Sequence, residues 1–277
     1  MVKSISKILF SVFLPGLVCV IIGCKVDLIG LFGSNDLSER LKEKNNFKYL
    51  DEIDGRNLTI MDDVFDFIVL TDTHVENGDI KDLKKISAAI GANVKFVAIL
   101  GDITQKGAKK DIKKVTEFIS ALGVPCYPVI GNHDIYSGNW SEGWKKYIGS
   151  TRYRIDGDKV TLFMLDSANA FFGKDQLDWL EKELKSTNGE VFLFTHSDFF
   201  VEDKIKIQQL FDPVERARIM SILSGKCNMV FTGHSHERVI KKFDGIKYIS
   251  IEDYKSTLTY CLVHVNDGVV TYEFKKL

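Results

Sequence analysis

The chain has 277 residues, of which 45% are hydrophobic and 27% are charged. This size and composition predict one well-buried globular domain, with little room for a second. Because 37 basic residues nearly balance 38 acidic ones, the formal net charge is -1 and no overall field favours nucleic acid or an acidic surface. Binding of nucleic acid through a basic patch therefore has no support.

The first 24 residues have the layout of a secretion signal. Lys3 and Lys7 precede an uncharged, mostly apolar run over residues 8–22, which Gly23 and Cys24 follow. A helix over this run would span roughly 22 Å, which is less than the ~30 Å hydrocarbon core of a bilayer. A permanent membrane span is therefore the weaker interpretation.

The end of this segment resembles the cleavage box of bacterial lipoproteins, with Cys24 as the residue that is acylated. The resemblance implies a signal peptide over residues 1–24 and a domain attached to a membrane by lipid. The expected location is the bacterial cell envelope, facing the periplasm or the exterior. An ordinary signal peptide and an uncleaved anchor are the alternatives, and all three export the domain.

Residues 25–63 are polar and are interpreted as a tether with one short helix, a packed N-terminal extension being the alternative. The domain itself is expected over residues 64–277. It contains Cys126, Cys227 and Cys261, and an odd number of cysteines argues against a disulfide framework. These cysteines are expected to be small core residues.

From residue 65 onward, short apolar runs alternate with amphipathic segments, which predicts β-α-β-α order. The expected strands lie at residues 65–70, 96–100, 126–130, 160–165, 191–194 and 229–231, and the expected helices at 81–90, 109–122, 175–184 and 213–223. After Glu237 the pattern predicts only strands and turns, with strands at residues 239–243, 248–251, 258–265 and 269–274. Asp244-Gly245 and Asp267-Gly268 are hairpin turn signals.

Five of the six histidines lie in short polar segments that directly follow these apolar runs; the segments cover residues 71–74, 131–134, 195–196 and 233–236. A further segment, residues 100–102, supplies a carboxylate in the same position. Side chains at the carboxyl ends of parallel strands converge on one edge of a sheet. The expected set of donors is Asp72, His74, Asp102, Asn132, His196, His234 and His236.

This set contains nitrogen and oxygen donors and no thiolate, which suits Mn, Fe, Zn or Mg better than a structural zinc. Seven donors exceed what one tetrahedral ion needs, so two divalent ions that share Asp102 as a bridge are the economical arrangement. Two ions about 3.5 to 4 Å apart form a clamp for in-line displacement at phosphorus. A phosphate ester is therefore the expected substrate.

The series Asp-x-His, Gly-Asp, Gly-Asn-His-Asp, a lone His and Gly-His-x-His, in this order over residues 70–236, resembles the calcineurin-like metallophosphoesterase superfamily. The resemblance covers essentially the whole mature domain. It implies an α/β fold, a four-layer α/β/β/α sandwich of mixed sheets flanked by helices. It also implies one ion held by Asp72, His74 and His236, a second ion held by Asn132, His196 and His234, a bridging Asp102, and a catalytic His133.

The hypothesis that follows is attack on phosphorus by a hydroxide that bridges the two ions. Protonated His133 would stabilise the transition state or donate a proton to the leaving alkoxide. Asp134 follows His133 directly in the sequence. This carboxylate either supports the neighbouring site residues or simply holds its own loop.

Departures from subfamily patterns narrow the resemblance. Gln105, Lys106 and Asp134 stand where protein serine/threonine phosphatases carry other residues, and Gln105 replaces the tyrosine of purple acid phosphatases. Residues 101–107 and 176–180 resemble the small cyclic-nucleotide phosphodiesterase-like group. Many members of that group have proline after the lone histidine, whereas Ser197 follows it here, so the rim of the site is expected to differ.

The leading hypothesis is an exported, membrane-anchored, binuclear metal-dependent phosphoesterase, with hydrolysis of phosphodiesters or phosphomonoesters left open. A nuclease or a phospholipid-directed hydrolase is the alternative among enzymes. A catalytically silent binding lipoprotein is the alternative from another class, and the intact donor set argues against it.

Overall fold

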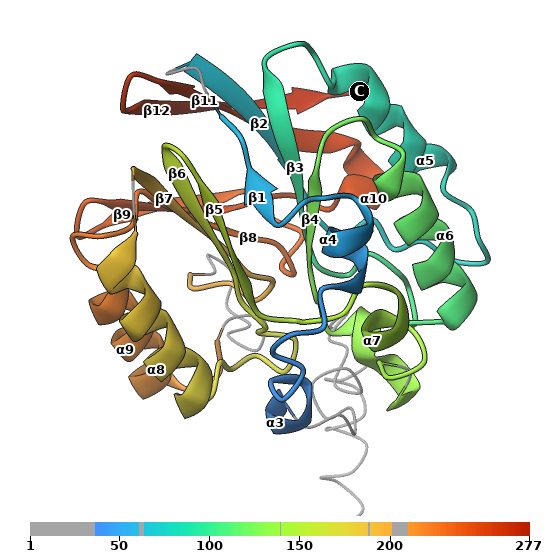
Figure 1. Cartoon of the computed structure of the whole chain (residues 1–277), viewed down its shortest axis with the longest axis horizontal. Coiled ribbons are helices and arrows are strands. Elements are labelled where there is room, and N and C mark those ends of the chain that lie inside the picture. The colour runs from blue at the N-terminus through green and yellow to red at the C-terminus, as the bar shows by residue number, and fades with distance from the viewer. Residues whose placement is uncertain (1–36, 61–63, 139, 188, 201–209) are drawn as a thin grey trace, which may run out of the picture.

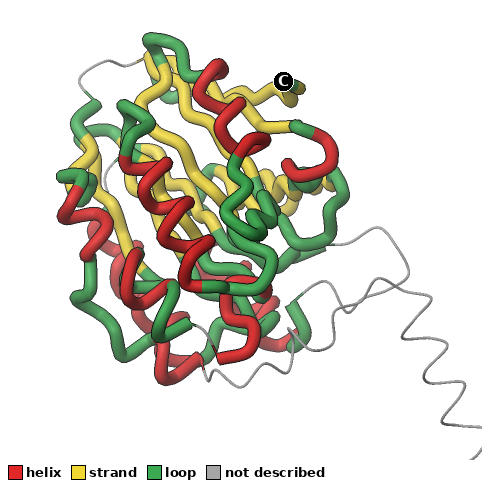
Figure 2. Tube along the Cα trace, turned by 90° about the vertical axis from the view of Figure 1, so that its right-hand side faces the viewer, coloured by secondary structure: helices red, strands yellow, loops and turns green. Residues whose placement is uncertain are grey.

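The computed structural model describes residues 37–60, 64–138, 140–187, 189–200 and 210–277, which are built around two β-sheets (Figure 1). Helices cover the outer face of each sheet, and Figure 2 shows them flanking the strands in a second view. The layers are therefore helix, sheet, sheet and helix. The predicted α/β architecture, with mixed sheets flanked by helices, is confirmed.

The smaller sheet has five strands in the order β12-β11-β2-β3-β4. Their bounds are β2 (Val64–Leu70), β3 (Val94–Leu100), β4 (Cys126–Val129), β11 (Thr259–Asn266) and β12 (Val269–Lys276). Strands β2, β3 and β4 run parallel, whereas β11 is antiparallel to both of its neighbours. The three parallel strands thus end at the same edge.

The larger sheet has seven strands in the order β1-β5-β6-β7-β8-β10-β9. Their bounds are β1 (Asn57–Leu58), β5 (Tyr153–Gly157), β6 (Val160–Met164), β7 (Glu190–Phe194), β8 (Met229–Thr232), β9 (Val239–Phe243) and β10 (Ile246–Ser250). Strands β6, β7, β8 and β10 are parallel, so their carboxyl ends also share one edge.

Helices α5 (Lys81–Lys84) and α6 (Lys109–Ser120) lie beside the five-stranded sheet, and α8 (Lys174–Glu183) and α9 (Pro213–Leu223) lie beside the seven-stranded sheet (Figure 1). In α6 the apolar side chains of Ile112, Val115 and Ile119 share the buried face, as the sequence predicts. Helix α9 begins as predicted, because the Asp212 carboxylate accepts a hydrogen bond from Val214 N and Pro213 fills the first position.

The remaining helical segments are short. They are α3 (Leu37–Arg40), α4 (Lys48–Glu52), α7 (Trp144–Tyr147), α10 (Tyr254–Thr257) and the 3₁₀ turns η1 (Lys85–Ala89), η2 (His133–Gly138) and η3 (Leu184–Ser186). The structure differs from the sequence-based expectation at two of the helices. The helix expected at residues 81–90 is α-helical only to Lys84 and continues as η1. The segment after Glu237 contains a helix, α10, because the Asp253 carboxylate accepts a hydrogen bond from Ser256 N and caps it.

Both expected hairpin turns are confirmed by their backbone angles. Asp244 and Gly245 have φ values of 49° and 81°, and Asp267 and Gly268 have values of 49° and 79°. Positive φ at both central residues is the requirement of a type I′ turn, which asparagine or aspartate followed by glycine meets. These turns connect β9 to β10 and β11 to β12.

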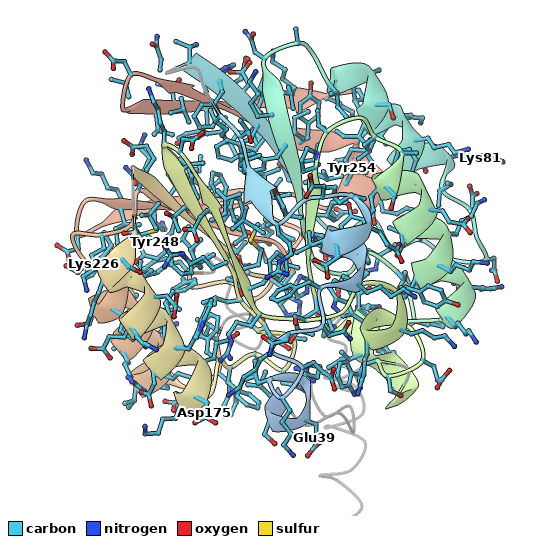
Figure 3. The ribbon with its side chains drawn as sticks, in the orientation of Figure 1. Glu39, Lys81, Asp175, Lys226, Tyr248 and Tyr254 are labelled. Atoms are coloured by element: carbon cyan, nitrogen blue, oxygen red, sulfur yellow. The ribbon has the colours of Figure 1, made fainter. Side chains whose placement is uncertain are left out.

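Aromatic side chains fill the space between the two sheets, where Figure 3 shows closely packed sticks. Phe67 of β2 stacks on Phe96 with ring centroids 4.6 Å apart. The same ring meets Phe192 and Phe231 of the other sheet edge-on, at centroid distances of 5.0 Å and 6.0 Å. Such pairs stabilise beyond the area they bury. They hold the two sheets, and therefore the loops at their edges, in a fixed relation.

The three domain cysteines contribute to these buried regions. Cys126, Cys227 and Cys261 are free and buried, as predicted for small core residues.

Residues 37–60 pack against the domain. Leu37, Tyr49, Leu50 and Leu58 are buried, and β1 pairs in parallel with β5. Residues 37–60 are therefore a packed N-terminal extension and not a spacer. Their apolar side chains are buried because this segment docks on the domain. Residues 1–36, with the expected signal and Cys24, lie outside the described residues. None of the helices in the described ranges has both the length and the apolar character that a membrane crossing requires.

Candidate metal centre

All five polar segments lie where the sequence predicts, directly after β2, β3, β4, β7 and β8. The two sheet edges meet at this point. The Nδ1 atom of His196, after β7, lies 2.7 Å from Leu100 O at the end of β3. In the other direction, His234 N, after β8, donates to Asp72 Oδ2 at 3.0 Å. The structure therefore brings the candidate residues of both sheets into one cluster.

The backbone at this cluster is strained. Five candidate residues have φ values between 41° and 67°, namely Asp72, His74, Asp102, His234 and His236. They are five of the eleven non-glycine residues with positive φ among the described residues, so the strain concentrates here. Left-handed conformations at such residues cost on the order of 1–3 kcal/mol each. The rest of the fold offsets this cost and thereby turns the side chains toward a common centre.

Two glycines allow the loops to approach this closely. A Cβ atom on Gly233 would lie 1.9 Å from Thr71 Oγ1, and one on Gly131 would lie 2.2 Å from Asp102 Oδ1. Neither distance is sterically allowed, so any side chain would push one loop away from the other. These two glycines therefore contribute to the site by leaving room for the neighbouring loop.

The first group of possible ligands consists of Asp72, His74 and His236. Asp72 Oδ1 lies 3.6 Å from His74 Nε2 and 3.3 Å from His236 Nε2. The other carboxylate oxygen is held by Thr71 Oγ1 at 2.6 Å. Asp72 Oδ1 is buried and has no hydrogen-bond partner among the described residues. A buried carboxylate oxygen without a donor is costly in a protein interior, and a cation at this position would satisfy it.

The second group consists of Asp102, His196 and His234, with Asn132 beside them. The Nε2 atom of His196 lies 2.9 Å from Asn132 Oδ1, 3.1 Å from His234 Nδ1 and 3.4 Å from Asp102 Oδ2. Because Leu100 O can only accept, Nδ1 of His196 carries its proton toward that carbonyl, and in the neutral ring Nε2 is left to bind a metal.

Asp102 lies between the two groups. It also forms a third possible ligand group with His74 and His133, so it contacts histidines on both sides. Its Oδ1 atom accepts a hydrogen bond from His133 N at 2.8 Å, and Oδ2 faces the histidine rings. Together the groups fit a binuclear metal site in which one carboxylate is shared.

The pKa values in this cluster follow from burial and from neighbouring charges. Burial opposes ionisation of Asp102, but the charges of His196 and His133 outweigh it and hold the pKa of Asp102 well below its usual range. Burial also disfavours a charged His196, yet Asp102 and Asp72 raise the pKa of His196 to about 10. Burial and the charge of His196 lower the pKa of His234 to about 3. The two buried carboxylates therefore attract positive charge to the space between them.

His133 is oriented by the main chain of the neighbouring loop. Its Nδ1 atom donates to Gln105 O at 2.8 Å, and its Nε2 atom lies 3.9 Å from Asp102 Oδ2. The ring packs edge-on against His74, with centroids 4.7 Å apart. The side chain is 16% exposed, so Nε2 is within reach of a ligand at the centre. Any residue at position 105 would present the same backbone carbonyl to His133, so the sequence does not indicate this contact.

Asp134 holds two of the site loops together. Its Oδ1 atom accepts from Thr104 N and from Thr104 Oγ1, both at 2.9 Å. Its Oδ2 atom accepts from Ile103 N at 3.2 Å and from Gly131 N at 3.0 Å. Burial and the charge of Asp102 raise the pKa of Asp134 to about 7. Asp134 therefore anchors two loops, one that carries Asp102 and one that carries Asn132.

Ser167, which belongs to none of the sequence motifs, also contacts the site. Ser167 Oγ, in the loop after β6, accepts hydrogen bonds from His196 N at 3.2 Å and from Ser197 N at 2.8 Å. Its only sequence signal is its position after a strand, and that signal is too common to identify a functional residue.

The observed geometry agrees with a comparison of the sequence with protein families. Residues 65–238 match the family described as calcineurin-like phosphoesterase. The chain belongs to this family. The matched range contains all the candidate site residues and excludes the packed N-terminal extension.

Individual relatives of this calcineurin-like phosphoesterase cover parts of the chain. A probable cyclic nucleotide phosphodiesterase of Fibrobacter succinogenes is 28% identical over 161 residues, which is 56% of this chain and 63% of that protein. A probable glycerophosphodiester phosphodiesterase of Arcobacter nitrofigilis is 31% identical over 111 residues, 36% of this chain and 41% of the relative. The chain thus spans less than two thirds of the length of each.

Among solved structures, a dimetal phosphatase from Danio rerio has the same fold. Its TM-score is 0.58 at 14% sequence identity, and the match covers 76% of this chain and 96% of the fish protein. At this identity the similarity supports the fold.

Replacing Asp134 with Ala tests the loop anchor. The change leaves three buried backbone N–H groups without their acceptor, so we expect it to lower the free energy of unfolding by about 3 kcal/mol or more. Asp212→Ala removes an exposed helix cap and is expected to cost only about 1 kcal/mol. Urea unfolding measures both, and equal small effects would contradict the anchoring role.

Proposed function

We propose that the chain is a metal-dependent phosphoesterase with a binuclear centre. The observation that carries the proposal is the buried, unpartnered Asp72 Oδ1 beside a second buried carboxylate, Asp102, with histidine nitrogens around both. Such a cluster is costly without a cation. Membership of the calcineurin-like phosphoesterase family supports the same conclusion.

In this proposal each ion has its own ligands, and Asp102 is shared. Asp72, His74 and His236 hold one ion, and Asn132, His196 and His234 hold the other. The donor set of nitrogen and oxygen suits Mn, Fe, Zn or Mg. When bound, the ions would neutralise charge on the phosphoryl oxygens and lower the pKa of the water that attacks phosphorus.

His133 is proposed as the catalytic histidine. Its Nδ1 atom is engaged by Gln105 O, and its Nε2 atom is directed toward the cluster. A ring held in this way can present a proton to a phosphoryl oxygen or to the leaving alkoxide. Asp102 Oδ2 lies 3.9 Å from Nε2, on the side of the ring that faces the cluster.

A phosphodiester is the proposed substrate class. The two relatives described above are both named as probable phosphodiesterases, one for cyclic nucleotides and one for glycerophosphodiesters. A nuclease or a phospholipid-directed hydrolase would also cleave a phosphodiester, and these stay alternatives. The donor set is complete, which disfavours a catalytically silent binding protein.

Export and lipid anchoring through Cys24 complete the proposal, and the support for them is the sequence of residues 1–24. The site would then face the periplasm or the exterior of the cell envelope.

Hydrolysis of two model esters tests the reaction class. We expect the full-length protein in detergent, loaded with manganese, to cleave bis-p-nitrophenyl phosphate faster than p-nitrophenyl phosphate, because the proposed substrate is a diester. Removal of metal with a chelator should abolish both activities, and added metal should restore them. Hydrolysis of neither ester by the metal-loaded protein would favour the silent binding protein.

Replacing His133 with Ala separates catalysis from metal binding. Loss of a general acid typically slows turnover by about 10²–10⁴-fold, while the ligands proposed here are untouched. Metal content, measured by elemental analysis, should stay near that of the unmodified protein. His264→Ala is the matched control, since His264 lies on β11, where its ring nitrogens contact Asp66 Oδ1 at 2.7 Å and Glu273 Oε1 at 3.2 Å. Loss of metal from the His133 variant would refute its proposed role.

Replacing Cys24 with Ser tests the anchor. Without the thiol no acyl chain can be attached, so incorporation of radioactive palmitate should disappear in bacteria that express the variant. Unchanged labelling would rule out Cys24 as the lipidated residue.

A further inference from the structure

A buried arginine from the N-terminal extension reaches the loop that follows β6. Arg40, at the end of α3, has no exposed surface. Its Nε atom lies 2.7 Å from Asp166 Oδ2, and its Nη2 atom lies 2.9 Å from Asp166 Oδ1. The same Nη2 donates to Asn169 Oδ1 at 2.7 Å. This is the two-pronged geometry that an arginine forms with a carboxylate, and here both partners are fully buried.

Asp166 is in turn fixed to its own loop. Asp166 N donates to Gln176 Oε1 at 2.9 Å, and Gln176 Nε2 donates back to Asp166 O at 2.8 Å. The carboxylate also accepts from Ala168 N at 3.1 Å. The arginine therefore holds a loop whose conformation is determined on both sides of Asp166.

The next residue of this loop contacts the metal centre. Ser167 Oγ accepts from the backbone N–H groups of His196 and Ser197, and Ser197 Oγ donates back to Ser167 O at 2.7 Å. Thr195 Oγ1 lies 2.8 Å from the same hydroxyl. A continuous set of buried contacts thus runs from Arg40 through Asp166 and Ser167 to the backbone of His196.

These contacts act directly on the His196 side of the centre. The loop of Asp72 is held from the other side of the molecule, because Tyr254 N donates to Thr71 O at 2.9 Å and Lys255 N donates to Asp72 O at 3.2 Å. Both donors belong to α10, beside the five-stranded sheet. A change at Arg40 should therefore disturb the His196 side and spare the Asp72 side.

A buried ion pair is a poor way to gain stability, because two charges lose their hydration. The presence of the Arg40–Asp166 pair is better explained by the loop that it holds in place, which contains Ser167. We propose that Arg40 is a positioning residue of the metal centre, which holds the His196 loop through Asp166 and Ser167. The N-terminal extension, which lies outside the family-matched residues 65–238, is thereby part of the active site. This inference rests on the proposed binuclear function.

Metal titration of the full-length protein in detergent tests the proposal. Manganese is titrated in competition with a chromogenic chelator, which gives two dissociation constants for two ions. We expect Arg40→Met, which keeps bulk and removes charge, to weaken one ion by about 10–100-fold, as changes to groups behind metal ligands typically do. In a His74→Ala background, where the His196 side dominates binding, Arg40→Met should have its full effect. In a His196→Ala background it should have little.

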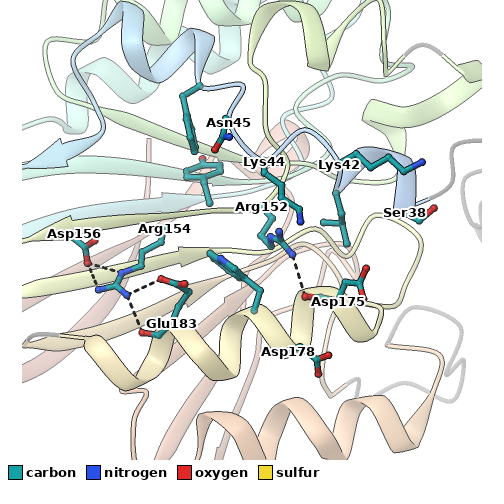
Figure 4. A pocket seen from close by; sticks show the side chains of 14 residues that line it. Ser38, Lys42, Lys44, Asn45, Arg152, Arg154, Asp156, Asp175, Asp178 and Glu183 are labelled. Carbon is teal, nitrogen blue, oxygen red and sulfur yellow. Dashed lines mark hydrogen bonds and ion pairs between the residues drawn. The ribbon is translucent and has the colours of Figure 1, made fainter.

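Arg154 provides the matched control. Its side chain is 13% exposed and pairs with Asp156 at 2.7 Å and Glu183 at 3.2 Å, as the dashed lines in Figure 4 show. The hydrogen bonds of its guanidinium group tie β5 to the end of α8 and to η3, away from the metal loops. Arg154→Met should lower the melting temperature and leave both manganese constants unchanged. A shared loss of affinity in both variants would reduce Arg40 to a merely structural role and overturn the proposal.

Two further measurements keep the proposal testable if Arg40→Met folds poorly. Ser167→Ala removes only the hydroxyl that accepts from His196 N, and it should weaken the same ion. Free guanidinium at millimolar concentration should restore the weaker constant in Arg40→Ala but should have no effect on the metal constants of Arg154→Ala. Two unchanged constants in both Arg40→Met and Ser167→Ala would overturn the inference. A failure of the unmodified protein to bind two ions would instead count against the proposed function.

Discussion

The Asp102 carboxylate lies where the edges of two sheets meet, and the candidate site is arranged around it. The three parallel strands of one sheet and the parallel strands of the other all deliver their loops to this point. Phenylalanines such as Phe67, packed between the sheets, keep the two edges in a fixed relation. A carboxylate shared by two ions must face the ligands of both ions at once. The relative position of the two sheet edges therefore determines whether the site can hold one ion or two.

Two features of the cluster lower the stability of the fold. One is the strained backbone, and the other is the buried charge, which is costly without a cation. Five of its residues adopt left-handed conformations, and Asp72 and Asp102 are buried close to histidines whose pKa values they affect. The surrounding groups hold the loops in place. Asp134 joins the loops of Asp102 and Asn132, and Ser167 holds the His196 loop. The local strain and buried charge lower the stability of the fold but direct the possible metal ligands toward one point. Such local strain is characteristic of functional sites.

The sequence predicts the site better than it predicts the support for it. Asp72, Asp102 and His196 each follow an apolar run, and the convergence of parallel strands at one sheet edge is enough to place Asp72 beside Asp102. His196 follows a strand of the other sheet, so its place beside them depends on how the two sheets pack. Arg40 and Ser167 have no such signal, because their importance comes from contacts between segments far apart in the chain. The sequence pattern does not predict strand β5, because Tyr153–Gly157 is short and half polar. Whether residues 37–60 pack or extend depends on docking of Leu37 and Tyr49, which local pattern does not reveal.

A crystal structure of the protein grown with manganese, with anomalous diffraction recorded, would show how many ions the cluster binds and which residues hold them. We expect two anomalous peaks about 3.5 to 4 Å apart, with Asp102 between them. One peak should contact Asp72 and His236, and the other should contact His196 and His234. A single peak, or two peaks that do not share Asp102, would contradict the proposed binuclear centre.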